Sequence, residues 1–332
     1  MQKISILGLG SRIPDAVVTN ADLAKRVDTT DEWITTRTGI KQRHILARDE
    51  TNTELGAVAA ERALADANLA PSDITHILVA TCTGDYITPS ASCLIADRIG
   101  IKGRYALDIN AACSGFLYGL ETAAGLIAMK PQAKVLLIAA EALSHRINWE
   151  DRSTCVLFGD GGAAMVLAAG TEKPAKQVGS LVDIETASDG SLGPLLHFGG
   201  QPESGEPYRI GSPLGPEFFV QMNGREVFKH AVRNMAAIST EVLQRNGLTV
   251  ADLDLVVPHQ ANSRIIEAVA SRLQVPEDTV YTNLPRTGNT SAVSIPLALD
   301  DARREGRLKP GMKVLACTFG GGLTWSAALF QF

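Results

Sequence analysis

Short apolar runs alternate along the chain with longer segments of helical periodicity. The runs THILVAT (75–81) and KVLLIAA (134–140) suit strands that helices cover on both faces. Apolar residues between Val227 and Leu243 recur at helical spacing, which predicts an amphipathic helix. Strands that alternate with helices in this way predict an α/β protein with mixed, largely parallel sheets.

The chain also repeats itself. Two pairs of segments match at one offset of 179 positions, namely 68–80 with 247–259 and 133–139 with 312–318. We therefore predict a duplicated unit, with an N-terminal half over 1–172 and a C-terminal half over 173–332 in one compact molecule. The alternative is a chance resemblance between segments of an α/β protein. Under the same offset Cys113 falls on Ala292.

Composition and charge narrow the class of protein. The 332 residues carry a net charge of −5, which argues against nucleic-acid binding because that needs a basic surface. No apolar run approaches the roughly 18 residues that span a membrane, and the N-terminus shows no signal-peptide pattern. Five cysteines without an export signal predict reduced thiols in a cytoplasmic protein. The lack of a CxxC pair and six scattered histidines argue against a metal site.

One stretch is too rich in Gly and Pro to form a regular element. Half of the residues in 199–216 are Gly or Pro. The stretch is longer than most loops of compact domains, so we predict a functional lid or a flexible linker.

Cys113 stands in DINAACSGFLYGL (108–120), between a strand-like run and a helix-like run. The backbone N–H groups at a helix start lower the pKa of a thiol and can hold an oxyanion. Small neighbours leave room for a substrate carbonyl. We therefore predict that Cys113 is a nucleophile for acyl transfer, and the alternative is a small core cysteine. The remaining cysteines are predicted to be core residues: Cys82, Cys93, Cys155 and Cys317.

Three further segments carry groups that suit the same chemistry. VVPHQANSRII (256–266) ends a predicted strand at His259, where α/β proteins place ligands. RTGNTSAVSIPLAL (286–299) places Asn289 at the equivalent junction of the second half, and an amide donates without ionising. The glycines of TFGGGLTWS (318–326) offer N–H groups to an oxyanion. The alternatives are a core histidine, a helix cap and a tight turn.

Together these motifs resemble one family. Cys113 in AACSG, His259 in HQAN, Asn289 in GNTS and the terminal FGGG run are similar to the β-ketoacyl-acyl-carrier-protein synthase III family. DTTDEWITTRTGIKQRHI (28–45) and FGDGGAAMVL (158–167) match it as well. The resemblance spans nearly the whole chain. It implies the thiolase fold, with two duplicated halves in α-β-α-β-α layers, and a homodimer.

The resemblance also implies a reaction, the decarboxylative condensation of an acyl-CoA primer with malonyl-acyl carrier protein that initiates fatty-acid synthesis. Cys113 would carry the acyl group, and the N–H groups of Cys113 and Gly321 would form the oxyanion hole. His259 and Asn289 would donate hydrogen bonds to the malonyl thioester oxygen, and Phe319 would form a dry wall beside the thiol. No metal or redox cofactor is implied, because acyl-CoA is a substrate.

For CoA, the resemblance implies that Trp33 and Arg152 sandwich the adenine, with Arg37 near the phosphates. A flat ring and a guanidinium suit stacking on a base. The alternative is that Trp33 caps a helix while Arg37 pairs with Asp31 or Glu32.

The carrier protein of the family is acidic, so a basic docking face is expected. Arg225, Lys229 and Arg233 recur along one predicted helix, and Arg264 and Arg272 share a side of the next. The family places its patch on Lys229, Arg264 and nearby positions. The alternative is an ordinary solvated face.

The acyl pocket is assigned to Thr88, Leu143 and Phe158. Short-chain members of the family often carry Phe where Thr88 stands. The smaller Thr88 predicts that a primer longer than acetyl fits.

Two other functions remain open from the residues. Condensing enzymes of polyketide or alkylquinolone biosynthesis share Cys-His-Asn but typically use CoA extenders. A thioester hydrolase would need Asp252 or Asp254 to complete a triad with Cys113 and His259, and it leaves Asn289 unexplained.

Overall fold

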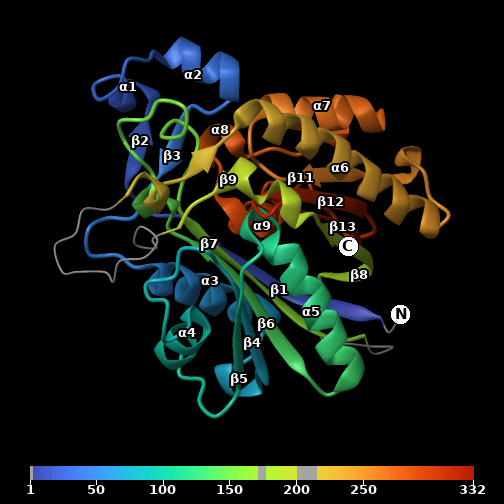
Figure 1. Ribbon diagram of the computed structural model, residues 1–332. Helices are drawn as coiled ribbons and strands as arrows, with labels where there is room; N and C mark the ends of the chain where they lie inside the picture. Colours follow the sequence, from blue (N-terminus) through green and yellow to red (C-terminus); the bar gives the residue numbers. More distant parts are fainter. Residues whose placement is uncertain (1–2, 171–176, 200–214) are drawn as a thin grey trace.

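The computed structural model describes residues 3–170, 177–199 and 215–332 (Figure 1). The strands are β1 (Ile4–Arg12), β2 (Val17–Thr19), β3 (Gln42–His44), β4 (His76–Ala80), β5 (Tyr105–Ile109), β6 (Lys134–Glu141), β7 (Gly161–Ala169), β8 (Gly179–Ser188), β9 (Leu196–His197), β10 (Gln221–Met222), β11 (Leu255–Pro258), β12 (Lys313–Gly320) and β13 (Thr324–Gln331). The helices are α1 (Asn20–Leu23), α2 (Asp31–Thr38), α3 (Asn52–Ala67), α4 (Ala91–Arg98), α5 (Gly115–Met129), α6 (Gly224–Arg245), α7 (Ser263–Leu273), α8 (Leu284–Thr287) and α9 (Ser294–Arg304). The 3-10 turns used below are η1 (Pro71–Asp73), η2 (Ala112–Ser114), η6 (Val250–Asp252) and η8 (Ser291–Val293). The predicted lid or linker, 199–216, lies almost wholly outside the described residues.

One large mixed sheet runs through the molecule in the order β11-β12-β13-β8-β1-β7-β6-β4-β5. At its ends β4 is parallel to β5 and β6, and β11 is parallel to β12. All the pairs in its centre are antiparallel. The prediction of largely parallel sheets is therefore wrong for the centre. One reason is the short connection between β12 and β13, which suits an antiparallel pair and is too short for a parallel crossover.

The two halves of this sheet meet at β1 and β8. These strands pair only over Ile4–Ile6 and Gly179–Leu181. The short ladder joins what the duplicated pattern predicts as separate sheets into one hydrogen-bonded sheet. The predicted boundary between residues 172 and 173 lies outside the described residues.

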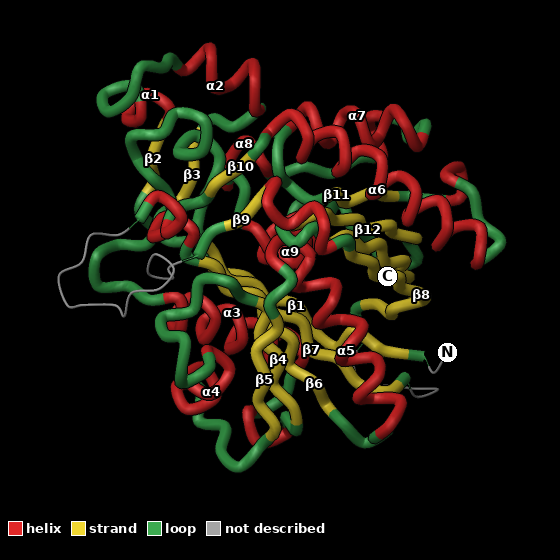
Figure 2. Tube along the Cα trace, viewed as in Figure 1, coloured by secondary structure: helices red, strands yellow, loops and turns green. Residues whose placement is uncertain are grey.

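Helices divide the molecule into layers (Figures 1 and 2). α3 and α4 pack on β4, β6 and β7, where Ile77 and Leu136 face them. α6 and α7 pack on β11, β12 and β13, where Val256 and Leu315 face them. α5 and α9 lie between, in a core that takes the alternate residues of both halves, such as Leu78. The predicted α-β-α-β-α architecture is confirmed.

Elements of the two halves recur at the predicted offset. β6 and β12 lie 179 positions apart at both ends, as do η1 and η6, and η2 and η8. Ala112 and Ser291 are equivalent under this offset, and their φ angles are 47° and 52°. Residues other than glycine rarely adopt this left-handed region. The backbone therefore repeats between the halves even where the residues differ.

One segment, Ala112–Met129, is long and apolar enough to cross a membrane by length and composition alone. This differs from the prediction that no such run exists. In the fold the segment forms η2 and α5, and Phe116, Leu117 and Leu120 are fully buried in the central core. Its apolar character is accounted for by its place between two sheet faces.

Candidate active site

Cys113 lies in η2, the turn that links β5 to α5. Ala112 before it has the left-handed φ described above. The turn is tied to the second half of the molecule, because Thr318 Oγ1 donates to the Cys113 carbonyl at 3.0 Å and Thr324 Oγ1 donates to the Ala111 carbonyl at 2.9 Å. The predicted strand-to-helix junction is present, with a 3-10 turn inserted before the helix.

Burial raises the pKa of the Cys113 thiol to about 11. A hydrogen bond from Ser291 and the backbone N–H of Cys113 itself lower that pKa, while the nearby Glu141 raises it. The prediction of a lowered pKa from the helix start alone is therefore wrong, because desolvation of the thiolate is the larger effect. A base or a hydrogen-bond donor must assist the thiol when it attacks.

His259 follows the last residue of β11 and is 3% exposed. Its backbone N–H donates to the Cys317 carbonyl at 2.7 Å, which continues the pairing with β12. Its Nδ1 lies 2.6 Å from Ser294 Oγ at the start of α9. Burial lowers the pKa of His259 to about 3, so the imidazole is neutral at physiological pH.

Asn289 is fixed by both its backbone and its side chain. Its N–H donates to the Leu157 carbonyl, and its carbonyl accepts from the Gly159 N–H, each at 2.9 Å. Its Oδ1 accepts from the Ser291 N–H at 2.9 Å. Because the oxygen is engaged in this way, the Nδ2 group remains to donate hydrogen bonds.

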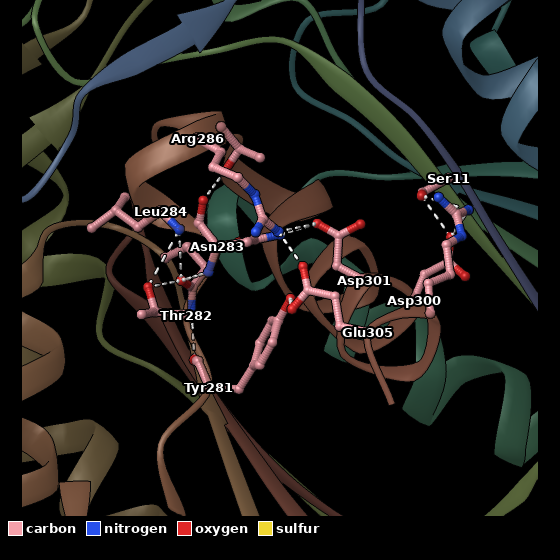
Figure 3. Close-up of polar contacts among 12 residues, drawn as sticks. Ser11, Tyr281, Thr282, Asn283, Leu284, Arg286, Asp300, Asp301 and Glu305 are labelled. Carbon is pink, nitrogen blue, oxygen red and sulfur yellow. Dashed lines mark hydrogen bonds and ion pairs between the residues drawn. The ribbon is translucent and has the colours of Figure 1, made fainter. Parts of the chain in front are cut away.

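Buried hydrogen bonds stabilise the segment between His259 and Asn289. Gln260 is fully buried, and its Oε1 accepts from the Thr282 hydroxyl at 2.7 Å and from the N–H groups of Asn283 and Leu284. Figure 3 shows the outer part of this network, where Asn283 Nδ2 donates to Asp301 on α9 at 2.8 Å. Arg286 and Tyr281 both reach Glu305, the residue that caps the C-terminus of α9 (Figure 3). These bonds hold the segment that leads to Asn289 against α9.

Cys113, His259 and Asn289 line one cavity of about 400 Å³. Phe319, whose predicted role is a dry wall, lines it as well. The cavity extends along α6 and the start of α7, where its lining includes Phe228. Three polar groups from η2, from the end of β11 and from the segment before η8 thus converge on a largely apolar space.

A second cavity, of about 730 Å³, is also lined by Cys113. Leu143 and Phe158, the residues assigned to the acyl pocket, line it. Thr88 lines neither this cavity nor the first and is exposed. Neither of these two cavities of its own chain thus includes Thr88, and its assignment to the acyl pocket stays a prediction. Its neighbour Ile87 lines the second cavity and is also fully exposed.

The glycine run 320–322 packs directly against η2. A Cβ on Gly320 would lie 2.7 Å from the Cys113 nitrogen, a distance that only glycine allows. Gly321 lines the second cavity beside Cys113. The run therefore brings the backbone of the second half against the turn that carries the thiol, and the oxyanion hole stays a prediction.

The residues predicted to hold CoA lie together. Arg37 and Arg152 each place a guanidinium over the Trp33 ring, at 5.1 and 4.9 Å from its centroid. Arg152 also donates to the Asp28 carbonyl at 2.7 Å. Thr30, and not Trp33, caps α2 through its side chain. The three side chains form one cationic and aromatic surface.

The four residues predicted to dock a carrier protein are exposed on α6 and α7: Arg225, Lys229, Arg264 and Arg272. Arg225 and Arg264 line the first cavity, one on each helix. Lys229 lies one turn beyond Arg225 and is 3.4 Å from Glu226. Arg272 is in the last turn of α7 and does not line the cavity.

Several residues of the site are not found by the sequence motifs. Glu141, Ser291 and Ser294 are fully or almost fully buried and contact the groups that line the cavities. A carboxylate at the end of an apolar strand was the one available signal for Glu141. Cys155 and Cys317 are core residues as predicted, whereas Cys93 is exposed and Cys82 is partly buried.

The hydrolase alternative finds no support in the positions of its acids. Asp252 accepts from the N–H and hydroxyl of Thr249 and so closes its own turn. Asp254 accepts from the Lys313 N–H at 2.8 Å. His259 instead has Ser294 at its Nδ1.

Comparison with known proteins gives consistent matches over the whole chain. A family model described as 3-oxoacyl-[acyl-carrier-protein (ACP)] synthase III matches residues 107–190, and the model of its C-terminal part matches residues 243–332. The chain is 57% identical to a β-ketoacyl-[acyl-carrier-protein] synthase III of Nitratidesulfovibrio vulgaris (strain Miyazaki F), over 98% of this chain and 97% of the relative. It is 56% identical to the enzyme of that name from Oleidesulfovibrio alaskensis, over 99% of both. The crystal structure of 3-oxoacyl-[acyl-carrier-protein] synthase III from Aquifex aeolicus superposes with a TM-score of 0.90 at 44% identity, covering 99% of this chain and all of the other.

Proposed function

The chain belongs to the β-ketoacyl-[acyl-carrier-protein] synthase III family, and from this premise we propose that Cys113, His259 and Asn289 carry out its reaction in the cavity that they line. The enzyme is an acyltransferase that condenses an acyl-CoA primer with malonyl-acyl carrier protein and initiates fatty-acid synthesis. It needs no cofactor, because acyl-CoA is a substrate. The convergence of the three side chains on one cavity is the observation that supports these roles.

In the first half-reaction, Cys113 Sγ attacks the thioester carbonyl of the primer and CoA leaves. The negative charge that develops on the carbonyl oxygen is held by the N–H groups of Cys113 and Gly321. Gly320 keeps these two segments close enough, because any side chain there would collide with the Cys113 nitrogen. The acyl chain enters the second cavity, beside Leu143 and Phe158.

In the second half-reaction, malonyl-acyl carrier protein loses CO2 and leaves a carbanion whose charge moves onto its thioester oxygen. Asn289 Nδ2 and His259 Nε2 donate hydrogen bonds to that oxygen. A proton on Nε2 requires that the Ser294 hydroxyl donates to Nδ1, and the 2.6 Å contact suits this. A neutral histidine is the right form for a donor that must not give up its proton, and the pKa of about 3 keeps it neutral. The carbanion then attacks the acyl-Cys113 carbon and releases the 3-oxoacyl product.

The test separates the two half-reactions. Intact-protein mass is measured after mixing with acetyl-, octanoyl- or lauroyl-CoA, and malonyl-acyl carrier protein is then added. We expect one acyl adduct in the wild type and none in Cys113→Ala. We expect His259→Ala and Asn289→Ala to acquire the adduct but to discharge it at least about 10²-fold more slowly, because each removes a donor to the oxyanion. An adduct on Cys113→Ala would contradict the assignment of the nucleophile.

The same experiment shows which acyl chain length the enzyme prefers in its primer. The second cavity, at about 730 Å³, is large for an acetyl group. We propose that octanoyl-CoA acylates Cys113 at least as fast as acetyl-CoA does. A strong preference for acetyl-CoA would show that another group fills this space in the working enzyme.

In a homodimer, the partner copy supplies a group that fills the second cavity. β5 is an edge strand of the large sheet, and its Tyr105 and Leu107 are exposed apolar side chains. Ile87 is fully exposed on the loop before α4, and α4 is tied to β5 because the N–H groups of Ala91 and Ser92 donate to Asp108. We propose that two copies pair along β5 and that the loop with Thr88 faces the partner. Sedimentation of Leu107→Lys, which charges this edge, is expected to show the monomer.

We propose that Trp33, Arg37 and Arg152 bind CoA, and that the basic residues of α6 and α7 bind an acidic carrier protein. Arg152→Gln is expected to raise the KM for acyl-CoA about tenfold with little change in kcat, because it removes binding energy common to the ground and transition states.

Arg264→Glu is expected to raise the KM for malonyl-acyl carrier protein and to leave acylation by acyl-CoA unchanged. The expected location of the enzyme is the cytoplasm, where both substrates are made.

A further inference from the structure

A buried carboxylate that the proposed reaction does not use lies behind Cys113. Glu141 is the last residue of β6 and is fully buried. Donors reach it from the segment Thr81–Thr83, which follows β4, and from Ser291 in η8 of the second half. The carboxylate therefore sits where the two halves meet, next to the turn that carries the nucleophile.

The two oxygens of Glu141 share the Cys82 thiol, at 3.2 Å from Oε1 and 3.5 Å from Oε2, and differ in their other partners. Oε2 accepts from the Cys82 N–H at 3.3 Å, from the Thr83 hydroxyl, and from the Thr81 hydroxyl at 3.5 Å. Oε1 accepts from Ser291 Oγ and from Cys82 Sγ, each at 3.2 Å. The partners of Oε2 hold the carboxylate in place, and Oε1 is the oxygen in contact with a hydroxyl that faces the site.

Ser291 links Glu141 to the nucleophile. A hydrogen bond from Ser291 lowers the pKa of Cys113, and both residues line the second cavity. The Ser291 N–H is held by Asn289 Oδ1, and its φ of 52° is one that a residue with a side chain adopts only when its surroundings fix it. The hydroxyl thus bonds the carboxylate at 3.2 Å and lines the same cavity as the thiol.

Glu141 and Cys113 oppose each other's ionisation. The charge of Glu141 raises the pKa of Cys113, because two negative charges in one buried site repel each other. Burial also raises the pKa of Glu141 to about 7, although the donors from Thr83, Cys82 and Ser291 lower it. A proton that moves from the thiol to the carboxylate leaves one negative charge in the site instead of two.

In the described chain, the titratable groups that face Glu141 are the thiols of Cys82 and Cys113. Burial raises the pKa of Cys82 well above its usual range, so Cys82 stays a thiol. Arg146 faces Cys82 from the other side of the cavity. The remaining elements packed on Glu141 present neutral groups: Gly161 of β7, Asn52 of α3 and Ser291 of η8. Its titration is therefore coupled to these two thiols.

We propose that Glu141 is a positioning residue that accepts the proton of Cys113 through the Ser291 hydroxyl. As Sγ attacks the thioester carbon, the thiol proton passes to Ser291 Oγ while the Ser291 proton passes to Glu141 Oε1. When the bond from that carbon to the CoA sulfur breaks, the same path returns the proton to the departing sulfur. CoA leaves as a thiol, Glu141 is again a carboxylate, and Cys113 holds the acyl group.

His259 is the other possible acceptor, and it is poorly suited to this step. Its pKa of about 3 makes it a weak base, and its proposed role needs the proton that Nε2 already carries. A base is most effective when its pKa lies near the working pH, and Glu141 meets this condition. The inference rests on the proposed function, since it assigns a role within the acylation of Cys113.

The test is the pH dependence of acylation in a single turnover with acetyl-CoA, followed by quenched-flow mass measurement from about pH 5.5 to about pH 9.5. In the wild type we expect the rate to rise with pH and to level off above about 7, where Glu141 is ionised. Glu141→Gln keeps the size of the side chain and one acceptor oxygen but cannot take the proton. We expect this variant to be about 10²-fold slower near pH 7. Its rate should keep rising with pH, because only the free thiolate reacts.

Matched variants separate this role from a structural one. Ser291→Gly removes the hydroxyl at a backbone conformation that glycine adopts freely, so it should show the profile of Glu141→Gln. Glu141→Asp should restore the plateau in part. Asp160→Asn removes another fully buried carboxylate, one that accepts from Leu46 and Ser144, and it should keep the wild-type profile.

A plateau above about pH 7 in Glu141→Gln or in Ser291→Gly would overturn the proposal, and so would a decrease by one constant factor at every pH. If Glu141→Gln does not fold, Ser291→Gly decides alone. Failure of the wild type to acquire any acyl group would instead overturn the proposed function, so the two failures are distinguishable.

Discussion

The turn at Ala112–Ser114 and the turn at Ser291–Val293 are the same structure with different chemistry. Each follows an asparagine whose Oδ1 accepts from the N–H two residues on, at 3.3 Å for Asn110 and 2.9 Å for Asn289. Each begins with a left-handed residue and leads into a central helix. The first turn carries Cys113, the proposed nucleophile, whereas the second has Ala292 at the equivalent position, carries the Ser291 hydroxyl and follows the amide of Asn289.

The strands that end beside these two turns are also equivalent in structure and carry different residues. β6 ends at Glu141 and β12 ends at Gly320, which are equivalent under the offset of 179. Glu141 contacts the turn of the second half through Ser291, and Gly320 lies against the turn of the first half at Cys113. A duplicated backbone thus supplies two similar turns with similar strand ends beside them. One active site forms because each half carries different side chains at these positions and contacts the turn of the other half.

The largest effect is expected from moving the thiol between the two turns. Cys113→Ala should lower condensation by about 10⁵-fold or more, as expected when a nucleophile is removed. Adding Ala292→Cys to that variant should restore nothing, because Ala292 is buried in the central core and lines neither cavity. Product formation from acyl-CoA and malonyl-acyl carrier protein is the measurement. Activity in the double variant would mean that the turns are interchangeable.

The next largest effect is expected from substitution of Asn289, and substitution of Asn110 should have a different effect. Asn289→Ala should lower the rate of decarboxylation by an amount equal to ~2.7–4 kcal/mol, because it removes a donor to the oxyanion. Asn110→Ala loses the same bond to its turn, and we expect only about 1 kcal/mol of lost stability from it. Release of CO2 from malonyl-acyl carrier protein and urea unfolding distinguish these effects. Equal losses of activity would show that both asparagines act only on the backbone.

The buried carboxylate should give the stability of the protein a pH dependence that the variant lacks. The pKa of Glu141 is raised from 4.5 to about 7 in the fold, so its contribution to stability is complete below pH 4.5 and is lost as the pH rises through about 7. The total loss, relative to Glu141→Gln, should be roughly 3 kcal/mol. Urea unfolding of both proteins across this pH window measures it. Parallel curves would indicate that Glu141 keeps its usual pKa.

Gly320 should give the smallest effect of this set. Gly320→Ala places a Cβ 2.7 Å from the Cys113 nitrogen and 3.0 Å from the Ser114 nitrogen, and we expect a loss of about 1–3 kcal/mol with slower acylation. Gly125→Ala is the control, because no atom lies within 4 Å of its Cβ on α5. This control should gain roughly 0.5–1 kcal/mol. Thermal unfolding and the acylation rate measure both variants, and unchanged acylation in Gly320→Ala would argue against a tight contact.

Sequence patterns predicted the parts of this site that carry local signatures. Cys113, His259 and Asn289 each stand at the end of a buried strand or at the start of a helix, and the duplicated spacing predicted that their elements would be related. The role of Thr88 stays a prediction, because a sequence position says nothing about whether a loop points into its own chain or outward. The pKa of Cys113 was misjudged, because desolvation depends on everything packed around the thiol and not on the helix start alone.

The sequence by itself determined the elements and their repetition, because apolar periodicity and turn residues act over a few neighbouring positions. It also determined which residues have the chemistry to act, since a thiol, an imidazole and an amide are properties of single side chains. Only the tertiary structure decided that Glu141 faces Cys113 through Ser291, as these residues are up to 178 positions apart in sequence and meet where the halves pack. The whole fold sets how deeply each group is buried and which groups lie close together. Burial and proximity then decide which of the available groups ionise, which donate hydrogen bonds and which take no part.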